Sequence, residues 1–289
     1  MIHIDQVIET CLTAIYSKDI LSEKLFLKGG QALRLAHNLK SRLSRDVDFS
    51  TPSKIEEEDL YFTHFEESLK TEFSANGFHL FDFRYVRRPE KRDGDAPDFW
   101  AGWAVDFKLI EKEKADLSLS QLRREAIIPE ESESSGILID ISEYEYCDSV
   151  DRITLGSVEI KSYSRVLLVL EKIRAICQQH PDYPHKRTAK NRARDYYDIE
   201  RLYQKVLRDA NKEQLLKEAA KHLEKVFKAK NADLQLLDKI FESSFYSLQE
   251  KGWEATKGTI SERVDNFSYY NETLKGIVEE LKQAMRAYE

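Results

Sequence analysis

LFLKGGQALRLAHNLKSRLSRDVDFS, residues 25–50, predicts two strands with a glycine pair and a helix between them. The apolar run Leu25–Leu27 indicates a short buried strand that stops at Gly29–Gly30. Gln31–Leu39 follows with apolar residues at helical spacing. Asp46–Phe49 then alternates charged and apolar residues, which is typical of a half-buried strand. The rest of the chain is organised around this unit.

The two aspartates of the second expected strand are the first candidate site residues. Side chains alternate along a strand, so we expect Asp46 and Asp48 to leave one side while their apolar neighbours enter the core. Two close carboxylates repel each other unless a cation lies between them. A hard ion such as Mg²⁺ or Mn²⁺ takes oxygen ligands and leaves positions for phosphate oxygens. Gly29 and Gly30 would let backbone N–H groups approach a phosphate, so the stretch predicts a nucleoside triphosphate held over metal.

The order of these features resembles a known motif. A glycine pair, a spacer and Asp-x-Asp resemble the first motif of the nucleotidyltransferase superfamily. More narrowly, GGQALRL followed by RLSRDVDFS resembles the AbiEii/AbiGii toxin-type branch of that superfamily. The resemblance implies a nucleotidyltransferase-fold mixed sheet with flanking helices, and transfer of a nucleotide from an NTP to a hydroxyl acceptor.

The composition indicates a folded protein with a very polar surface. Of its 289 residues, 41% are hydrophobic and 34% are charged, enough for one large domain or two. The net charge of −7 argues against a basic coat for non-specific nucleic-acid binding, although a local basic patch is compatible with it. The three cysteines lack the spacing of a zinc site or a disulfide framework. No apolar run approaches the roughly 20 residues that span a bilayer, and the N-terminus has no signal-like segment, so we expect a cytoplasmic protein without membrane contact.

Further strands follow the first motif. A helix over Ile55–Asn76 is expected to bury an apolar stripe that includes Leu60. Phe78–Arg88 and Trp100–Glu111 are then expected to form an antiparallel hairpin, because no helix separates them. Gly136–Ile141 is an additional strand candidate.

Two aspartates on these strands are alternatives for a third metal carboxylate. In the fold that the resemblance implies, this carboxylate comes from a strand beside the Asp-x-Asp strand. Asp140 fits, because it ends an apolar run and starts an Asp-Ile-Ser pattern that resembles the corresponding strand of the toxin family. Asp106 is the alternative. We favour Asp140, because Lys108 lies on the same face as Asp106 and would neutralise it as a structural pair.

The second half of the chain contains two further motifs on expected helices. EKIRAI and RARDYYDI resemble the Glu-Lys-x-Arg-Ala and Arg-Asp-x-x-Asp helices of the AbiEii/AbiGii family. By this resemblance Lys172 neutralises phosphate charge as pyrophosphate leaves, with Arg174 as a helper beside the helix's apolar stripe. Asp195 and Asp198 share a helix face and would orient Lys172 or the nucleotide. Surface ion pairing is the alternative role for each of these residues.

Together these features predict an α+β protein with two domains. Residues 1–158 are expected to form a nucleotidyltransferase catalytic domain, and residues 159–289 a helical domain closing over the nucleotide. The resemblance implies a metal-dependent toxin of a bacterial toxin-antitoxin or phage-defence system, with a cognate antitoxin and an RNA, tRNA or protein acceptor. A small-molecule nucleotidyltransferase and a non-catalytic nucleotide-binding regulatory module are the alternatives.

Overall fold

The computed structural model describes residues 2–39, 44–89, 97–185, 189–209 and 212–287. Its seven-stranded mixed sheet and its helices confirm the expected mixed α/β class. The chain divides into two compact units. Unit 1 comprises Met1–Ala32, Ser44–Glu145 and Asp151–Ser162, and unit 2 comprises Leu33–Leu43, Tyr146–Val150 and Tyr163–Glu289. A division at residue 158 into functional domains stays a prediction.

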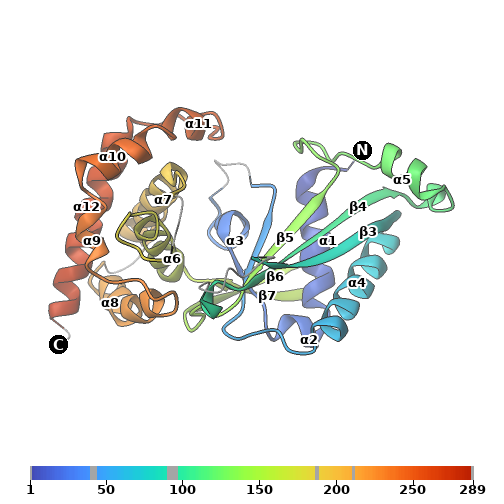
Figure 1. Cartoon of the computed structure of the whole chain (residues 1–289), viewed down its shortest axis with the longest axis horizontal. Coiled ribbons are helices and arrows are strands. Elements are labelled where there is room, and N and C mark those ends of the chain that lie inside the picture. Colours follow the sequence, from blue (N-terminus) through green and yellow to red (C-terminus); the bar gives the residue numbers. More distant parts are fainter. Residues whose placement is uncertain (1, 40–43, 90–96, 186–188, 210–211, 288–289) are drawn as a thin grey trace. The chain divides into compact units, whose positions relative to one another are not determined.

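Unit 1 is built on the sheet, whose strand order is β3-β4-β5-β2-β1-β7-β6 (Figure 1). The strands are β1 Phe26–Lys28, β2 Val47–Ser50, β3 Phe78–Arg88, β4 Gly102–Glu111, β5 Ile137–Ser142, β6 Val150–Leu155 and β7 Val158–Tyr163. The pairs β3–β4, β4–β5 and β1–β2 are antiparallel, and the pairs β2–β5 and β1–β7 are parallel. The predicted β3–β4 hairpin is therefore confirmed. The first motif supplies the central strand β2 and its neighbour β1.

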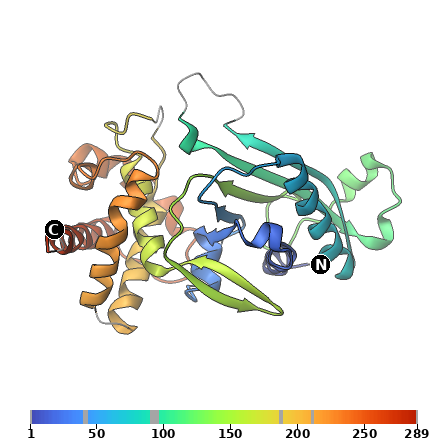
Figure 2. The same cartoon turned by 90° about the horizontal axis from the view of Figure 1, so that it is seen from below.

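Two helices cover one face of this sheet, α1 (Ile4–Tyr16) and α4 (Glu58–Ala75) (Figure 2). The ring of Phe49 on β2 lies 6.2 Å from that of Tyr16 on α1. The ring of Phe62 on α4 lies 4.9 Å from that of Trp103 on β4. Because side chains alternate along a strand, the residues directly before and after Phe49 and Trp103 face the opposite side of the sheet. That opposite side carries the polar residues.

Shorter elements complete unit 1. They are α2 Asp19–Ser22, the first residues of α3 (Gly29–Leu35), α5 Leu119–Glu125 and two 3₁₀ turns, Asp98–Trp100 and Lys112–Lys114. The expected burial of Leu60 on α4 is wrong, since 48% of this residue is exposed. Leu60 lies about 200° around the helix from Phe62, at about 100° per residue, and so points away from the buried stripe.

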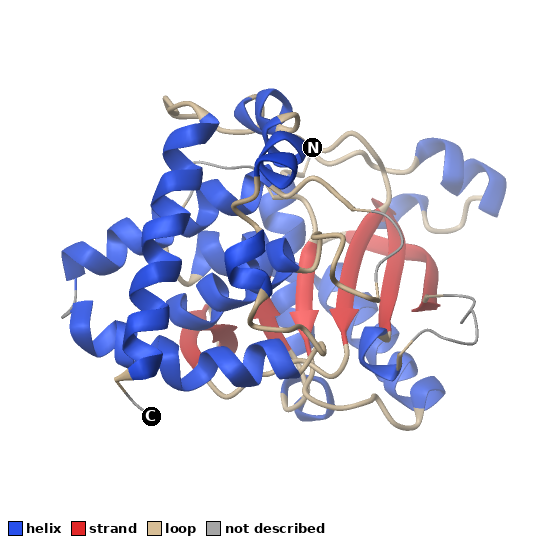
Figure 3. Ribbon diagram, turned by 60° about the vertical axis from the view of Figure 1, so that its left-hand side comes forward, coloured by secondary structure: helices blue, strands red, loops and turns tan. Residues whose placement is uncertain are grey.

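Unit 2 is a helical body (Figure 3). Its helices are α6 Arg165–Cys177, α7 Ala193–Asp209, α8 Lys212–Lys228, α9 Leu236–Lys239, α10 Ser243–Glu250, α11 Trp253–Lys257 and α12 Phe267–Arg286. α6 packs against α7, α8 and α9. Contact with three helices buries α6 on most of its circumference, including its charged residues Lys172 and Arg174.

Among the residues that the structure describes, no helix is both long enough and apolar enough to cross a bilayer.

Candidate active site

Two predicted site aspartates, Asp48 and Asp140, lie side by side on the polar face of the sheet. β2 and β5 run parallel with Asp48 opposite Asp140. Residues in register on neighbouring strands leave the same face, with the strands about 4.8 Å apart. On the other side of β5, Ala104 of β4 lies opposite Asp140, so β4 contributes no carboxylate next to Asp140. The sheet therefore presents a pair of carboxylates without any movement of the backbone.

Asp46, the first aspartate of the Asp-x-Asp motif, lies just before β2, in a bend. The expected strand began at Asp46, whereas β2 begins at Val47. Strand alternation therefore does not fix the direction of this side chain, which is exposed. The Nε2 atom of Gln31, a buried residue of α3, donates to the carbonyl oxygen of Ser44 at 2.7 Å. This bond ties the chain before Asp46 to α3, the helix that begins with the glycine pair.

Gly29 is required by the position of the Asp48 carboxylate. Its φ angle is +66°, a left-handed conformation that side chains disfavour. A Cβ atom at this position would lie 2.2 Å from Oδ2 of Asp48 and 2.9 Å from its Cγ. Only glycine leaves room for the aspartate. The glycine of the motif and its second aspartate are thus parts of one packed arrangement.

The electrostatic environment of Asp140 comes from four sources. Burial raises the pKa of the Asp140 carboxyl above its ordinary value, and the charge of Asp46 raises it further. The positive charges of Arg88 and Lys28 oppose this rise in the pKa. Arg88 ends β3, opposite Gly102 on β4. The site therefore combines carboxylates that disfavour each other's ionised form with two cations that favour it.

Sequence reasoning missed Lys28 and Arg88 as site residues. Lys28 is in register with Asp48 across β1 and β2. Its Nζ atom donates to Oγ of Ser142 at 3.0 Å and lies 3.6 Å from Oε1 of Glu145. The signal for Lys28 was present in the sequence. Leu27 is a core residue, so strand alternation turns Lys28 toward the polar face.

Asp106, the alternative third carboxylate, lies on the same face but is engaged elsewhere. It is opposite Leu138 on β5 and opposite Arg84 on β3. Nη2 of Arg84 lies 2.7 Å from Oδ1 of Asp106. The expected neutralising partner, Lys108, lies instead 3.9 Å from Asp82. The expected partner is therefore wrong, and Arg84 takes its place.

The oxygen donors on this face fit a hard divalent cation. Magnesium is commonly held by one or two carboxylates, with water and substrate phosphates completing its octahedron. The aligned pair Asp48 and Asp140 provides such donors. Within the described part of the chain, no group of three or more His, Cys, Asp or Glu side chains forms a ready cluster for a metal. The metal roles of Asp46, Asp48 and Asp140 stay predictions.

Unit 2 brings three of the other predicted residues together. Nζ of Lys172 on α6 lies 2.7 Å from Oδ1 of Asp195 and 2.8 Å from Oδ2 of Asp198, both on α7. All three residues are at most 8% exposed. Asp195 also lies 3.5 Å from Nη1 of Arg192. The two aspartates therefore fix the position of the Lys172 ammonium group, and the cluster is not a set of surface ion pairs.

Arg174 is also buried, with 3% of it exposed. Its Nη2 atom lies 3.2 Å from Oε1 of Glu171. The sequence pattern predicted that Arg174 lies beside a buried apolar stripe. Because α7, α8 and α9 surround α6, the buried surface extends around most of the helix and includes Arg174.

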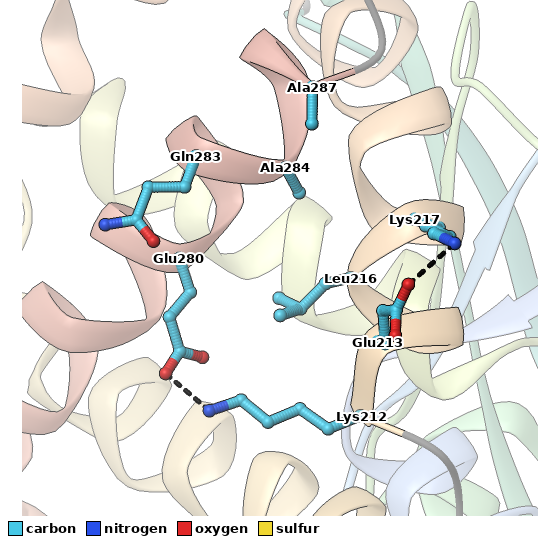
Figure 4. A pocket seen from close by; sticks show the side chains of 8 residues that line it. All are labelled: Lys212, Glu213, Leu216, Lys217, Glu280, Gln283, Ala284 and Ala287. Atoms are coloured by element: carbon cyan, nitrogen blue, oxygen red, sulfur yellow. Dashed lines mark hydrogen bonds and ion pairs between the residues drawn. The ribbon is translucent and has the colours of Figure 1, made fainter.

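A groove of about 590 Å³ between α8 and α12 is a separate feature of unit 2 (Figure 4). Its lining residues are Lys212, Glu213, Leu216, Lys217, Glu280, Gln283, Ala284 and Ala287. Lys212 pairs with Glu280 at 2.6 Å, and Lys217 pairs with Glu213 at 2.8 Å. None of the predicted site residues lines this groove, and these charges pair with each other.

Residues 10–280 match the family model for the nucleotidyl transferase AbiEii toxin of a Type IV toxin-antitoxin system. A search of curated proteins gave no match.

Two crystal structures of Helicobacter pylori proteins are similar over most of the chain. JHP933 has a TM-score of 0.47 at 16% identity, covering 98% of this chain and 92% of that one. A protein described as a candidate nucleotidyltransferase has a TM-score of 0.46 at 17% identity, covering 99% and 96%.

Proposed function

Because the chain belongs to the nucleotidyl transferase AbiEii toxin family, we propose that it moves a nucleotide from an NTP to a hydroxyl acceptor in a metal-dependent reaction. The observation that carries this proposal is the alignment of Asp48 with Asp140, with Gly29 packed against the first of them. Paired carboxylates beside a glycine turn are the groups that nucleotidyl transfer from a metal-bound triphosphate requires.

Each residue on the polar face of unit 1 has a proposed role. Asp48 and Asp140 hold the metal ion, and Asp46, whose charge influences Asp140, completes the set. Mg²⁺ or Mn²⁺ bound there would polarise phosphate oxygens and neutralise their developing charge. The alternative role for Asp140 is to accept the proton of the attacking hydroxyl in place of binding the metal, since burial raises the pKa of its carboxyl and so makes it a stronger base. Gly29 and Gly30 are proposed to contact the nucleotide.

The Lys172 cluster of unit 2 has a proposed role on the triphosphate. An ammonium group held by two carboxylates has its position fixed before substrate arrives, which favours electrostatic stabilisation of a developing charge. Lys172 would act on the phosphate charge as pyrophosphate leaves, and Arg174 would assist it. Asp195 and Asp198 would orient Lys172, and through it the nucleotide.

The biological role is proposed from family membership. The family description supports a toxin of a toxin-antitoxin system, with a cognate antitoxin protein as partner. We propose an RNA or tRNA 3′ end, or a protein hydroxyl, as the acceptor, in the cytoplasm. The chemistry requires only a hydroxyl group in line with the α-phosphate.

The test is incubation of the purified protein with α-labelled NTPs, Mg²⁺ and total RNA or total protein from a bacterial extract. The proposed function predicts label transferred to one acceptor class, with stoichiometric release of pyrophosphate. Nucleotide binding without pyrophosphate release in any extract would contradict it and would favour a regulatory nucleotide-binding module. Labelling of a small molecule alone would identify the other alternative.

A further inference from the structure

Lys28 is a part-buried cation beside the proposed metal ligands. It directly precedes the glycine pair and lies opposite Asp48. Paired residues on neighbouring strands share a face, so the Lys28 side chain leaves the sheet beside the Asp48 carboxylate. Only 12% of this side chain is exposed.

The path of the Lys28 side chain is fixed by its contacts. Lys28 belongs to β1 and Ser142 to β5, with β2 between them. Because Nζ of Lys28 donates to Ser142 Oγ at 3.0 Å, the side chain crosses β2 on the face that carries Asp48. Ser142 lies two residues beyond Asp140 on the same strand and the same face. The ammonium group therefore lies within about one strand repeat, roughly 7 Å, of both proposed ligands.

We infer that Lys28 is a positioning residue that balances the charge of Asp48 and Asp140 and weakens metal binding until a nucleotide arrives. This inference rests on the proposed metal site. A cation close to a divalent ion repels it, and exclusion from water strengthens this repulsion. The phosphates of a bound triphosphate add negative charge and offset the repulsion. Lys28 thereby links tight metal binding to the presence of the nucleotide.

A purely structural role is the competing explanation. Glu145 is buried, and its Oε1 atom lies 3.6 Å from Nζ of Lys28, so the lysine also anchors the chain after β5. Loss of an anchor loosens a site and weakens metal binding, whereas loss of a repelling charge strengthens it. The two explanations predict opposite changes in metal affinity.

The experiment measures Mn²⁺ binding to the full-length protein without nucleotide, by electron paramagnetic resonance of free Mn²⁺ at about 0.15 M salt. Lys28→Met and Lys28→Gln remove the charge, and the second keeps a donor for Ser142. Both are expected to bind Mn²⁺ about three- to tenfold more tightly than the wild type, the range for one charge at this distance with partial screening. Lys28→Arg keeps the charge and is expected to stay within about twofold.

Lys108→Met is the matched control. Lys108 lies on the same sheet face, four residues along β4 from Ala104, the partner of Asp140, or about 13 Å away. Screening beyond a Debye length of about 8 Å leaves its effect below about twofold. Unchanged or weaker Mn²⁺ binding by Lys28→Met, with its circular dichroism spectrum intact, would overturn the inference. If Lys28→Met does not fold, the same result for Lys28→Gln overturns it. Absence of saturable Mn²⁺ binding by the wild type would instead overturn the proposed metal site.

Discussion

Substitution of Gly29 by alanine perturbs the point where the glycine pair meets the Asp48 carboxylate. The added Cβ atom would lie 2.2 Å from Oδ2 of Asp48, on a residue whose φ angle is +66°. The left-handed conformation costs an alanine about 1–2 kcal/mol. An ordinary carbon–oxygen contact is near 3.5 Å, so the carboxylate must also move by about 1 Å. A displacement of this size in a catalytic group typically costs about 100-fold in rate.

Gly77→Ala separates the two contributions. Gly77 follows α4 with a φ angle of +83°, and a Cβ atom there would meet nothing within 4 Å. Gly77→Ala should therefore lower the free energy of unfolding by about 1–2 kcal/mol through backbone strain alone. Gly29→Ala should add the displacement of Asp48 to a similar loss of stability.

Two assays on both variants test this reasoning. Urea unfolding measures stability, and pyrophosphate release from NTPs in a cell extract measures transfer. We expect Gly77→Ala to retain wild-type transfer and Gly29→Ala to lose about 100-fold. If Gly29→Ala transferred nucleotide as fast as Gly77→Ala, the close packing of Gly29 on Asp48 would have no part in activity.

Two predictions concern unit 2. Lys172→Met leaves Asp195 and Asp198 buried without their lysine and should destabilise the protein by about 3–5 kcal/mol in urea unfolding. Unchanged stability would show that the buried ion pairs of Lys172 do not contribute to the stability of the fold. Burial raises the pKa of the Glu200 carboxyl, and the hydrogen bond from Tyr269 opposes this rise. Because the folded state holds this proton more tightly, stability falls as pH rises from the ordinary glutamate pKa of about 4.3 through the raised folded value. Glu200→Gln should therefore raise the urea midpoint at pH 7 but not near pH 4; an equal gain at both pH values would contradict this origin.

The order of elements in the first motif was predictable from the sequence. A glycine pair that ends a strand and the alternation of polar and apolar residues along a strand depend only on residues near in sequence. The strands β1 and β2 and the β3–β4 hairpin follow from such signals. The alignment of Asp140 with Asp48 did not follow from them, because register between strands distant in sequence depends on the whole sheet. The order of motifs in the family favoured Asp140, and its metal role is still untested.

Other features depended on packing that sequence periodicity does not contain. The burial of Lys172 and Arg174 follows from the helices around α6, which the pattern of one helix cannot show. The strands β6 and β7 extend the sheet but were not predicted. None of the residues of β6 is fully buried, so this strand lacks an apolar run, whereas the alternation of Val158, Glu159 and Ile160 in β7 was a signal that the sequence contained. The partner of Asp106 was wrong, because the register of β3 brings Arg84 opposite it.

The measurement that tests the central claim most directly is Mg²⁺-dependent pyrophosphate release by Asp48→Asn, Asp140→Asn and Asp106→Asn variants under identical conditions. Our account predicts that the first two lose transfer by about 100-fold or more, because each removes a charged ligand from the aligned pair. Asp106→Asn should remain within a few fold of the wild type, because that carboxylate is paired with Arg84. Full activity of Asp48→Asn, or an active Asp140→Asn beside an inactive Asp106→Asn, would contradict the account.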